Sequence, residues 1–157
     1  MTTLSIPNIR DALATAIRAV FTGTGVTIPN VYGYPPDSPE LVALCIVPAA
    51  GDSGNYIDYR GTFEGPAGAL CTINLAAEIR VGGGQIDAAR TLDAHLSAVD
   101  GMSLLNALRS NPTLTGLVEQ VFVGHCSVPT WFRSQDEARE WISASFPITV
   151  RARRPAA

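Results

Sequence analysis

The alternating pattern at residues 70–81 constrains the fold of this chain more than any other feature of the sequence. One set of alternate positions is apolar and comprises Cys71, Ile73, Leu75, Ala77, Ile79 and Val81. The intervening set comprises Thr72, Asn74, Ala76, Glu78 and Arg80. Because successive side chains of a strand point to opposite faces, the pattern predicts a long strand with one face on a core. The other face meets solvent or a partner, so the fold contains a sheet.

Two helices and several further strands are predicted by their own patterns. Ser5 and Pro7 mark a helix start, and Gly23 with Gly25 marks its end. The apolar stripe of this helix is Ile9, Leu13, Ala16, Ile17, Val20 and Phe21. A second helix has the stripe Ile86, Ala89, Leu92, Leu96 and Val99, and a short third one runs from Ser103 to Leu108. The other predicted strands are 26–32, 41–47 (buried on both faces), 56–64, 118–128 and 141–151.

The order of these elements predicts an α+β fold in a single domain. Short, turn-rich links between the strands favour a mixed, mostly antiparallel sheet with helices packed on one face. Residues 56–64 and 70–81 flank Gly65-Pro66-Ala67-Gly68, which predicts a long hairpin. Pro147 in the last strand favours an edge position or a bulge. With 157 residues, the chain 1–157 is one domain, and 153–157 is expected to be a flexible tail.

Composition favours an assembly over an isolated soluble monomer. Charged residues make up only 16% of the chain, against about 25% in typical soluble proteins, while 46% are hydrophobic. The alternative is a compact protein whose surface is covered by small alanine and glycine residues. All 11 basic residues are arginine and the net charge is −3, so no overall basic field attracts nucleic acid. No signal peptide or membrane-spanning run is expected.

Motifs for phosphate or serine chemistry are incomplete. Gly82-Gly83-Gly84 lies between a strand and a helix, but Asp87 stands where the dinucleotide fingerprint requires glycine. Ser103 follows Gly101, yet position 105 is leucine, so the GxSxG elbow is absent. We therefore expect neither a cofactor nor catalytic residues, and the protein is expected not to be an enzyme.

The titratable side chains also have structural explanations. His95 is expected to be a partly buried structural residue at the edge of the second helix's stripe. His125 and Cys126 are neighbours in a predicted strand, so their side chains diverge and cannot easily share a metal. No metal site is expected. Asp136, Glu137 and Glu140 fit a solvated hairpin tip, and Cys45 and Cys71 fit apolar strand positions.

The segment from Val31 to Pro39 is expected to be a contact surface. Its sequence, Val31-Tyr32-Gly33-Tyr34-Pro35-Pro36-Asp37-Ser38-Pro39, lies between a helix and a buried strand. Prolines disfavour both helix and sheet interior, so the segment is stiff and extended. Tyrosines are frequent at contacts between subunits. The expected interface residues here are Tyr32, Tyr34, Pro35, Pro36 and Asp37.

A basic cluster at the end of the sequence gives two further interface candidates. Arg151 and Arg153 share one strand face by alternation, and Arg154 follows them. They could meet DNA phosphates or carboxylates on a neighbouring subunit. A solvated basic tail is an equal alternative.

Four segments together resemble the tail terminator proteins of long-tailed, non-contractile bacteriophages, especially those of actinobacteria. These segments are Ile9-Arg10-Asp11-Ala12-Leu13, then Val31 to Asp37 running into the strand 42–48, then Leu92-Asp93-Ala94-His95-Leu96, then Gly101-Met102-Ser103-Leu104-Leu105-Asn106-Ala107-Leu108. The resemblance covers positions 9 to 108, and the closing strands fit the same architecture.

The resemblance implies a structural function. Such proteins form a ring, expected to be a homohexamer, that caps the tail tube, ends its polymerisation and provides the surface for head–tail joining. The implied partners are other copies of the chain, the tail tube protein and a head–tail connector, with DNA passing through the lumen without sequence-specific binding. The implied location is the tail–neck junction of the virion, after assembly in the host cytoplasm. The alternatives are another neck or head-closure protein and, more distantly, a tube subunit or a small ligand-binding enzyme.

Overall fold

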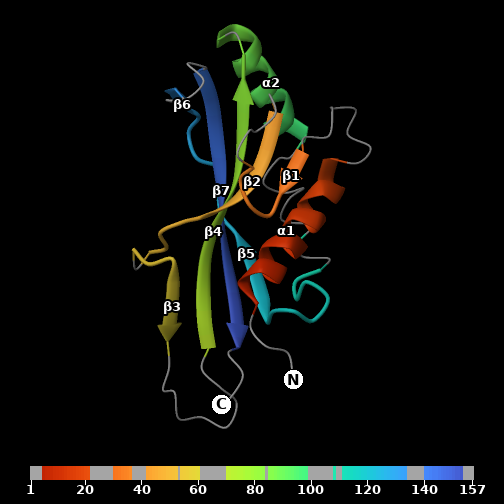
Figure 1. Ribbon diagram of the computed structural model, residues 1–157, viewed down its shortest axis with the longest axis vertical. Coiled ribbons are helices and arrows are strands. Elements are labelled where there is room, and N and C mark those ends of the chain that lie inside the picture. Colours follow the sequence, from red (N-terminus) through yellow and green to blue (C-terminus); the bar gives the residue numbers. More distant parts are fainter. Residues whose placement is uncertain are drawn as a thin grey trace.

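The computed structural model describes residues 5–21, 30–36, 42–52, 54–60, 70–83, 85–98, 108, 111–133 and 140–153. These residues form two helices and seven strands of a single α+β domain (Figure 1). The helices are α1 (Ile6–Phe21) and α2 (Gln85–Ala98). The strands are β1 (Asn30–Tyr32), β2 (Val42–Pro48), β3 (Ile57–Arg60), β4 (Leu70–Gly82), β5 (Gln120–Val123), β6 (Thr130–Arg133) and β7 (Glu140–Arg153).

Two long antiparallel strands, β4 and β7, form the centre of the sheet. Their register runs from the pair Leu70 and Arg153 to the pair Gly82 and Trp141. Each long strand carries two short strands along its other side: β2 and β3 pair with β4, whereas β6 and β5 pair with β7. β1 extends the sheet beyond β2 in the parallel direction. The sheet is therefore mixed and mostly antiparallel, as predicted, and β3 with β4 forms the predicted hairpin.

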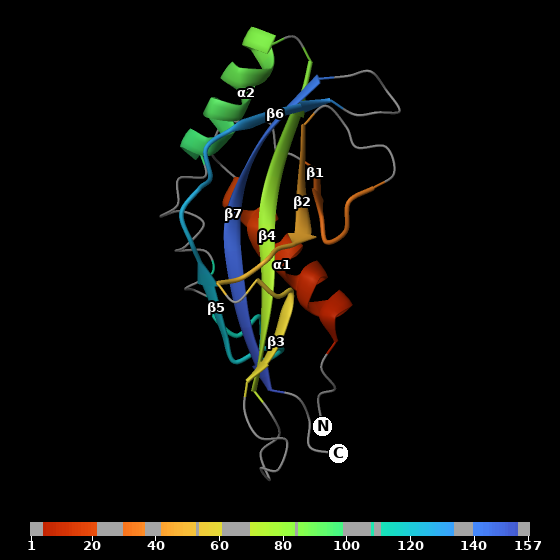
Figure 2. The ribbon, with the colours of Figure 1, turned by 90° about the vertical axis from the view of Figure 1, so that its left-hand side faces the viewer.

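Both helices cover the same face of the sheet (Figures 1 and 2). α1 packs on β1 and β2, whereas α2 packs on β4 and β7. The core between them is apolar and includes Ile9, Leu13, Ile17, Leu44, Ile46, Ile73, Leu75, Ile79, Leu92, Phe146, Ile148 and Val150. All six apolar positions of the alternating set in β4 are buried, which confirms that pattern. The centre of β2, from Ala43 to Ile46, is fully buried, as expected for a strand covered on both faces.

α1 begins where the sequence predicts. The Ser5 carbonyl accepts a hydrogen bond from the backbone N–H of Ile9 at 3.0 Å, and the Ser5 hydroxyl accepts one from Asn8 at 3.4 Å. These contacts satisfy N–H groups that have no partner within the first turn. Ser5 is therefore the N-cap of α1, and Pro7 lies in the first turn, where its missing N–H costs nothing.

The predicted strand at 118–128 is wrong in its extent. β5 ends at Val123, an irregular segment occupies 124–129, and β6 follows as a strand that the sequence did not predict. The interruption lies opposite Pro147, whose carbonyl accepts a hydrogen bond from Gly124 at 2.8 Å but which has no N–H to return. β7 is thus not an edge strand; instead, its proline lies where the neighbouring strand breaks. Because a Cβ at position 124 would be 2.5 Å from Pro147 Cγ, only glycine permits this approach.

The predicted stripe of the second helix is also partly wrong. Ile86 is 70% exposed, and the buried positions of α2 are Ala88, Leu92 and His95. These residues are four and three positions apart, so they form one helical face, turned by a fraction of a turn from the predicted one. Ala89 and Leu96 of the predicted stripe are partly buried and pack against the core, so the prediction is wrong for Ile86 alone among the described positions.

Several predictions fall outside the described residues, either wholly or in part. They concern the strand portions 26–29 and 61–64, the turn 65–68, the short third helix apart from Leu108, Asp37, Asp136, Glu137, Val99, Gly23, Gly25 and residues 154–157. Arg153, assigned to the tail from sequence, is instead the last residue of β7.

Candidate functional site

The expected contact segment is anchored at its start and exposed farther along. Tyr32 ends β1 and is half-buried, and Gly33 is buried. Tyr34 is 44% exposed, Pro35 is exposed and Pro36 is half-buried. The segment therefore leaves the sheet edge at β1 with an aromatic ring and a proline accessible to a partner.

Arg10 of α1 holds this segment in place. The side chain is 5% exposed, and its Nε donates a hydrogen bond to the Gly33 carbonyl at 2.6 Å. A terminal N–H of the same guanidinium donates to the Ile46 carbonyl, and the Tyr34 ring stacks over it with a centroid distance of 3.7 Å. The guanidinium thus fills the point where β1 diverges from β2. A side chain at Gly33 would overlap the Asp11 carboxylate, so α1 and this turn approach closely.

A second arginine of α1 holds the middle of β1. A terminal N–H of Arg18 donates a hydrogen bond to the Val31 carbonyl at 2.8 Å. Arg10 and Arg18 are eight residues apart and so lie near one face of the helix. Together they satisfy two carbonyl groups, those of Val31 and Gly33, on the short strand and its exit. The local sequence pattern around these arginines predicts neither role.

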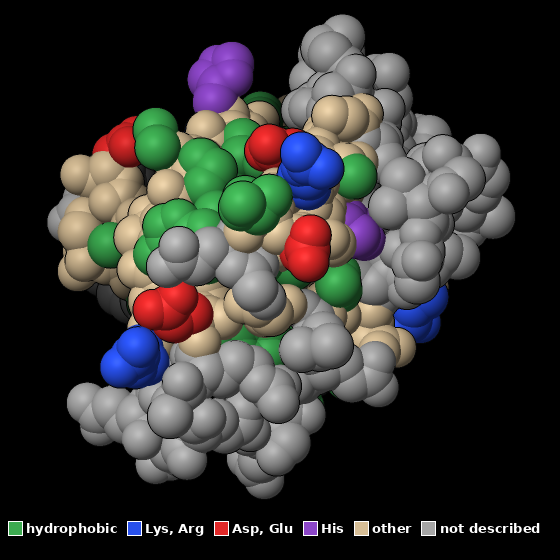
Figure 3. Space-filling model, turned by 90° about the horizontal axis from the view of Figure 1, so that it is seen from above, with side chains coloured by type: hydrophobic (Ala, Val, Ile, Leu, Met, Phe, Trp, Pro, Cys, Tyr) green, Lys and Arg blue, Asp and Glu red, His purple; other side chains and the backbone are tan. Residues whose placement is uncertain are grey.

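The opposite edge of the sheet carries the largest group of exposed apolar side chains. Among the described residues, the exposed large hydrophobic side chains are Tyr34, Ile86, Phe122, Val128, Trp131 and Phe132, four of which lie between positions 122 and 132. Every residue of β6 is exposed. Figure 3 views the molecule from the end that carries α2 and β6 and shows hydrophobic side chains gathered there beside charged ones. Among the described residues, this edge therefore has the most exposed large hydrophobic side chains.

Hydrogen bonds fix which backbone groups of β6 face outward. Ser145 and Pro147 accept from Ser127 and Gly124, so the odd-numbered residues of β7 bond toward β5 and β6. Since antiparallel pairs alternate, Thr130 and Phe132 bond to β7, and the N–H and C=O groups of Trp131 and Arg133 point to the other side. Among the described strands, β6 pairs with β7 alone. Its outer side is therefore an available strand edge.

A hollow lies along the same edge. It has a volume of about 340 Å³, and its described lining consists of Trp131, Phe132, Arg133 and Glu140. Arg133 and Glu140 form an exposed ion pair at 3.4 Å, which contributes little stability in solvent. We call this hollow the β6 groove. Trp131 and Phe132 are neighbours in β6, so their rings project to opposite faces of the sheet, and the Phe132 ring lies beside the Arg80 guanidinium at 6.0 Å.

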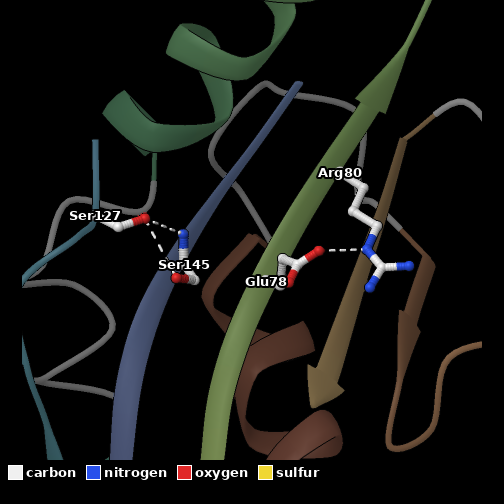
Figure 4. Close-up of polar contacts among 4 residues, drawn as sticks. All are labelled: Glu78, Arg80, Ser127 and Ser145. Atoms are coloured by element: carbon white, nitrogen blue, oxygen red, sulfur yellow. Dashed lines mark hydrogen bonds and ion pairs between the residues drawn. The ribbon is translucent and has the colours of Figure 1, made fainter. Parts of the chain in front are cut away.

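The sheet face opposite the helices is polar and internally paired. Glu78 and Arg80 of β4 form a partly buried ion pair (Figure 4). On the adjoining part of the sheet, Ser145 of β7 donates its backbone N–H to the Ser127 hydroxyl at 3.0 Å (Figure 4). The Ser127 contact fastens the irregular segment 124–129 to β7, whereas the ion pair joins two residues of β4 itself.

The two arginine candidates lie on this same face, as alternation predicts. Arg151 stacks over Phe122 with a centroid distance of 5.1 Å, and Arg153 donates to a Glu119 carboxylate oxygen at 2.6 Å. Both side chains are therefore engaged with β5 or its approach. Arg154 lies outside the described residues.

A polar cavity of about 250 Å³ also opens on this face. The polar side chains that line this cavity include those of Asp52, Asp58, Thr72, Asn74, Thr149 and Arg151. Asn74 has a structural role there: its amide N–H donates to the Asn55 carbonyl at 2.9 Å, and its backbone bonds to Ala49 and Tyr56. Asn74 thus bridges the gap between β2 and β3, which explains why a polar residue on the outer face of β4 is buried.

The histidines and cysteines have separate surroundings. His95 is buried, not partly buried as expected, and its Nδ1 lies 2.7 Å from the Thr91 carbonyl within α2. His125 and Cys126 are exposed and lie in the irregular segment, not in the predicted strand. Partial desolvation of its sulfur raises the pKa of the Cys126 thiol. Burial also raises the pKa of Cys45, and the neighbouring Arg80 opposes that effect.

The described residues contain no cluster of three or more histidine, cysteine or acidic side chains arranged to hold a metal ion. Neither described helix is long and apolar enough to span a membrane. No protein-family model matches the chain, and no curated protein matches it as a relative.

Proposed function

We propose that this protein is a tail terminator of a long-tailed, non-contractile bacteriophage. In this role, copies of the chain form a ring, expected to be a hexamer, on the last ring of the tail tube. The sequence resemblance described above motivates the proposal. The α+β domain with helices on one face of a mostly antiparallel sheet is compatible with the architecture that the resemblance implies.

The observation that carries the proposal is the exposed apolar edge at residues 122–132. Val128 is 84% exposed and Trp131 is 44% exposed, and Phe122 and Phe132 are also exposed large hydrophobic side chains in this range. A soluble monomer gains nothing from aromatic rings on an open strand edge, which is a template for association. Together with the low charge content of the chain, this edge supports a protein that works within an assembly.

The proposed mechanism is differential binding by the two faces of the ring. One face binds the last ring of tube protein, and the other lacks the surface that would recruit a further tube ring. Head-to-tail contacts between copies close the ring, whereas the same contacts without closure would form a filament. The outward face then presents the surface for the head–tail connector.

The mass and shape of the purified protein test this proposal. Six chains of 16.6 kDa give a ring of about 100 kDa, measurable by light scattering and visible by negative-stain microscopy. Filaments of variable length would favour a tube subunit instead. To separate a terminator from another neck or head-closure protein, purified tube protein is added: a terminator arrests its polymerisation, whereas a head-closure protein leaves it unchanged.

The contact segment provides a test in assembled particles. Replacing Tyr32 and Tyr34 with alanine should impair ring formation or head joining while the monomer stays folded by circular dichroism. The matched control replaces Tyr56, a half-buried tyrosine in the link before β3. Normal assembly of infectious particles by the double variant would contradict a role for this segment.

A further inference from the structure

We propose that Arg10 and Arg18 close the outer edge of β1, so that a strand from a second copy of the chain cannot extend the sheet there. The strand that they exclude is β6 of the second copy, whose own outer edge is open. The inference goes beyond the proposed function and does not depend on it, because it concerns only which side of the sheet can pair with another copy.

The backbone pairing of β2 shows which of its groups face β1. The N–H of Ala49, directly after β2, donates to the Asn74 carbonyl of β4 at 3.0 Å. Because the direction of hydrogen bonding alternates along a strand, the odd-numbered residues of β2 also bond toward β4. The even-numbered residues Leu44 and Ile46 therefore bond toward β1. In agreement with this direction, the Ile46 carbonyl accepts a hydrogen bond from Arg10 at the end of β1.

The groups of β1 that point outward are consequently those of Val31. Val31 is opposite Leu44 in the parallel register, and only one residue of such a pair bonds across to the other strand. Since Leu44 is the residue that bonds across, the N–H and C=O groups of Val31 point away from β2. Gly33 follows at the next outward position. An added strand would have to bond to these groups.

An arginine of α1 is already bonded to each of the two outward carbonyls. Arg18 donates to the Val31 carbonyl at 2.8 Å, and Arg10 donates to the Gly33 carbonyl at 2.6 Å. Hydrogen bonds from a charged donor are stronger than those from a backbone N–H, so an added strand would exchange stronger bonds for weaker ones. α1 also packs on β1 and lies beside it (Figure 1). A covering helix and edge charges are both ways in which native sheets avoid edge-to-edge association.

The outer edge of β6 differs from that of β1. The N–H and C=O groups of Trp131 and Arg133 point outward, and β7 is the one partner of β6 among the described strands. If β1 were open, β6 of one copy could pair with β1 of the next. Pairing between two unlike edges repeats from copy to copy and produces an open filament when the rotation does not close. The two arginines of α1 prevent this growth.

Sedimentation velocity over a wide range of protein concentrations tests the inference. Arg18→Met should form larger species than the wild-type protein, whatever the native mass of the latter. Removing one hydrogen bond from a charged donor should strengthen this association about tenfold. Two controls should behave like the wild-type protein: Arg90→Met on the exposed side of α2, and Ile79→Val, which weakens the core but leaves both edges intact. An unchanged mass for Arg18→Met, or equal growth of either control, would overturn the inference.

A second substitution identifies the strand that is added. Trp131→Pro removes an N–H that points outward and no hydrogen bond to β7, so it blocks addition at the β6 edge. Trp131→Thr removes the ring but keeps that N–H. In the Arg18→Met background, the proline variant should restore the wild-type mass, whereas the threonine variant should not. Association that survives Trp131→Pro, or that is lost equally with Trp131→Thr, would refute strand addition. Neither result would alter the outcome expected when tube protein is added to the wild-type chain.

Discussion

Arg10 provides the sharpest test of how this fold is held together. We expect Arg10→Met to lower the free energy of unfolding by about 4 kcal/mol. Two hydrogen bonds from a charged donor contribute at least about 1.5 kcal/mol each, and a half-exposed cation–π contact about 1 kcal/mol. Methionine keeps most of the apolar stem but leaves the Gly33 and Ile46 carbonyls without a donor.

Urea denaturation followed by circular dichroism measures this loss. At about 2–4 °C per kcal/mol for a domain of this size, the melting temperature should fall by about 8–16 °C. The matched control is Arg90→Met on the exposed side of α2, which should change stability by less than about 0.5 kcal/mol. A loss below about 1 kcal/mol for Arg10→Met, or one equal to the control, would refute the role assigned to this guanidinium.

Three further predictions concern the interruption beside β7, the thiols and α2. Gly124→Ala should destabilise the protein by about 1–3 kcal/mol because the added Cβ meets the Pro147 ring. In a double-mutant cycle, Pro147→Ala should remove at least half of that cost. Equal costs of Gly124→Ala in both backgrounds would contradict the contact. A thiol reagent should label Cys126 in the native protein, and Cys45 only after unfolding. Because partial desolvation raises the pKa of Cys126, native labelling should accelerate about tenfold per pH unit from pH 7 towards pH 9, and a flat rate would contradict this. Ile86→Ser should change stability by less than about 0.5 kcal/mol, whereas a loss above about 2 kcal/mol would mean that this side chain is buried.

The elements that the sequence predicted well are those buried along one face. The alternation in β4 and the stripe of α1 each arise because one side of the element packs on the core. The spacing of apolar residues in the sequence therefore predicts both the type of element and its buried face. The residues of β6 show no such alternation, because all four are exposed, and β6 is defined as a strand by its pairing with β7. Hydropathy cannot detect a strand of that kind.

Other features were hidden because they depend on distant partners. Arg10 is buried only because carbonyl acceptors 23 and 36 residues away meet at one point. His95 can face the core because Thr91, one turn earlier, provides a carbonyl beside its Nδ1. Of the candidate site, exposure of Tyr34 and Pro35 was predicted from composition. The β6 groove was not, since it exists only after β6 pairs with β7.

The pairing of β4 with β7 has a consequence for how the chain acquires this structure during synthesis. Leu70 pairs with Arg153, so the central ladder joins segments that leave the ribosome far apart in time. Until β7 emerges, one complete edge of the 13-residue strand β4 has no hydrogen-bonding partner. Such an edge invites association with other nascent chains, and contacts of long sequence separation form slowly. The interval between translation of β4 and β7 is therefore when this protein is most exposed to aggregation, and a fragment that stops before β7 should be insoluble.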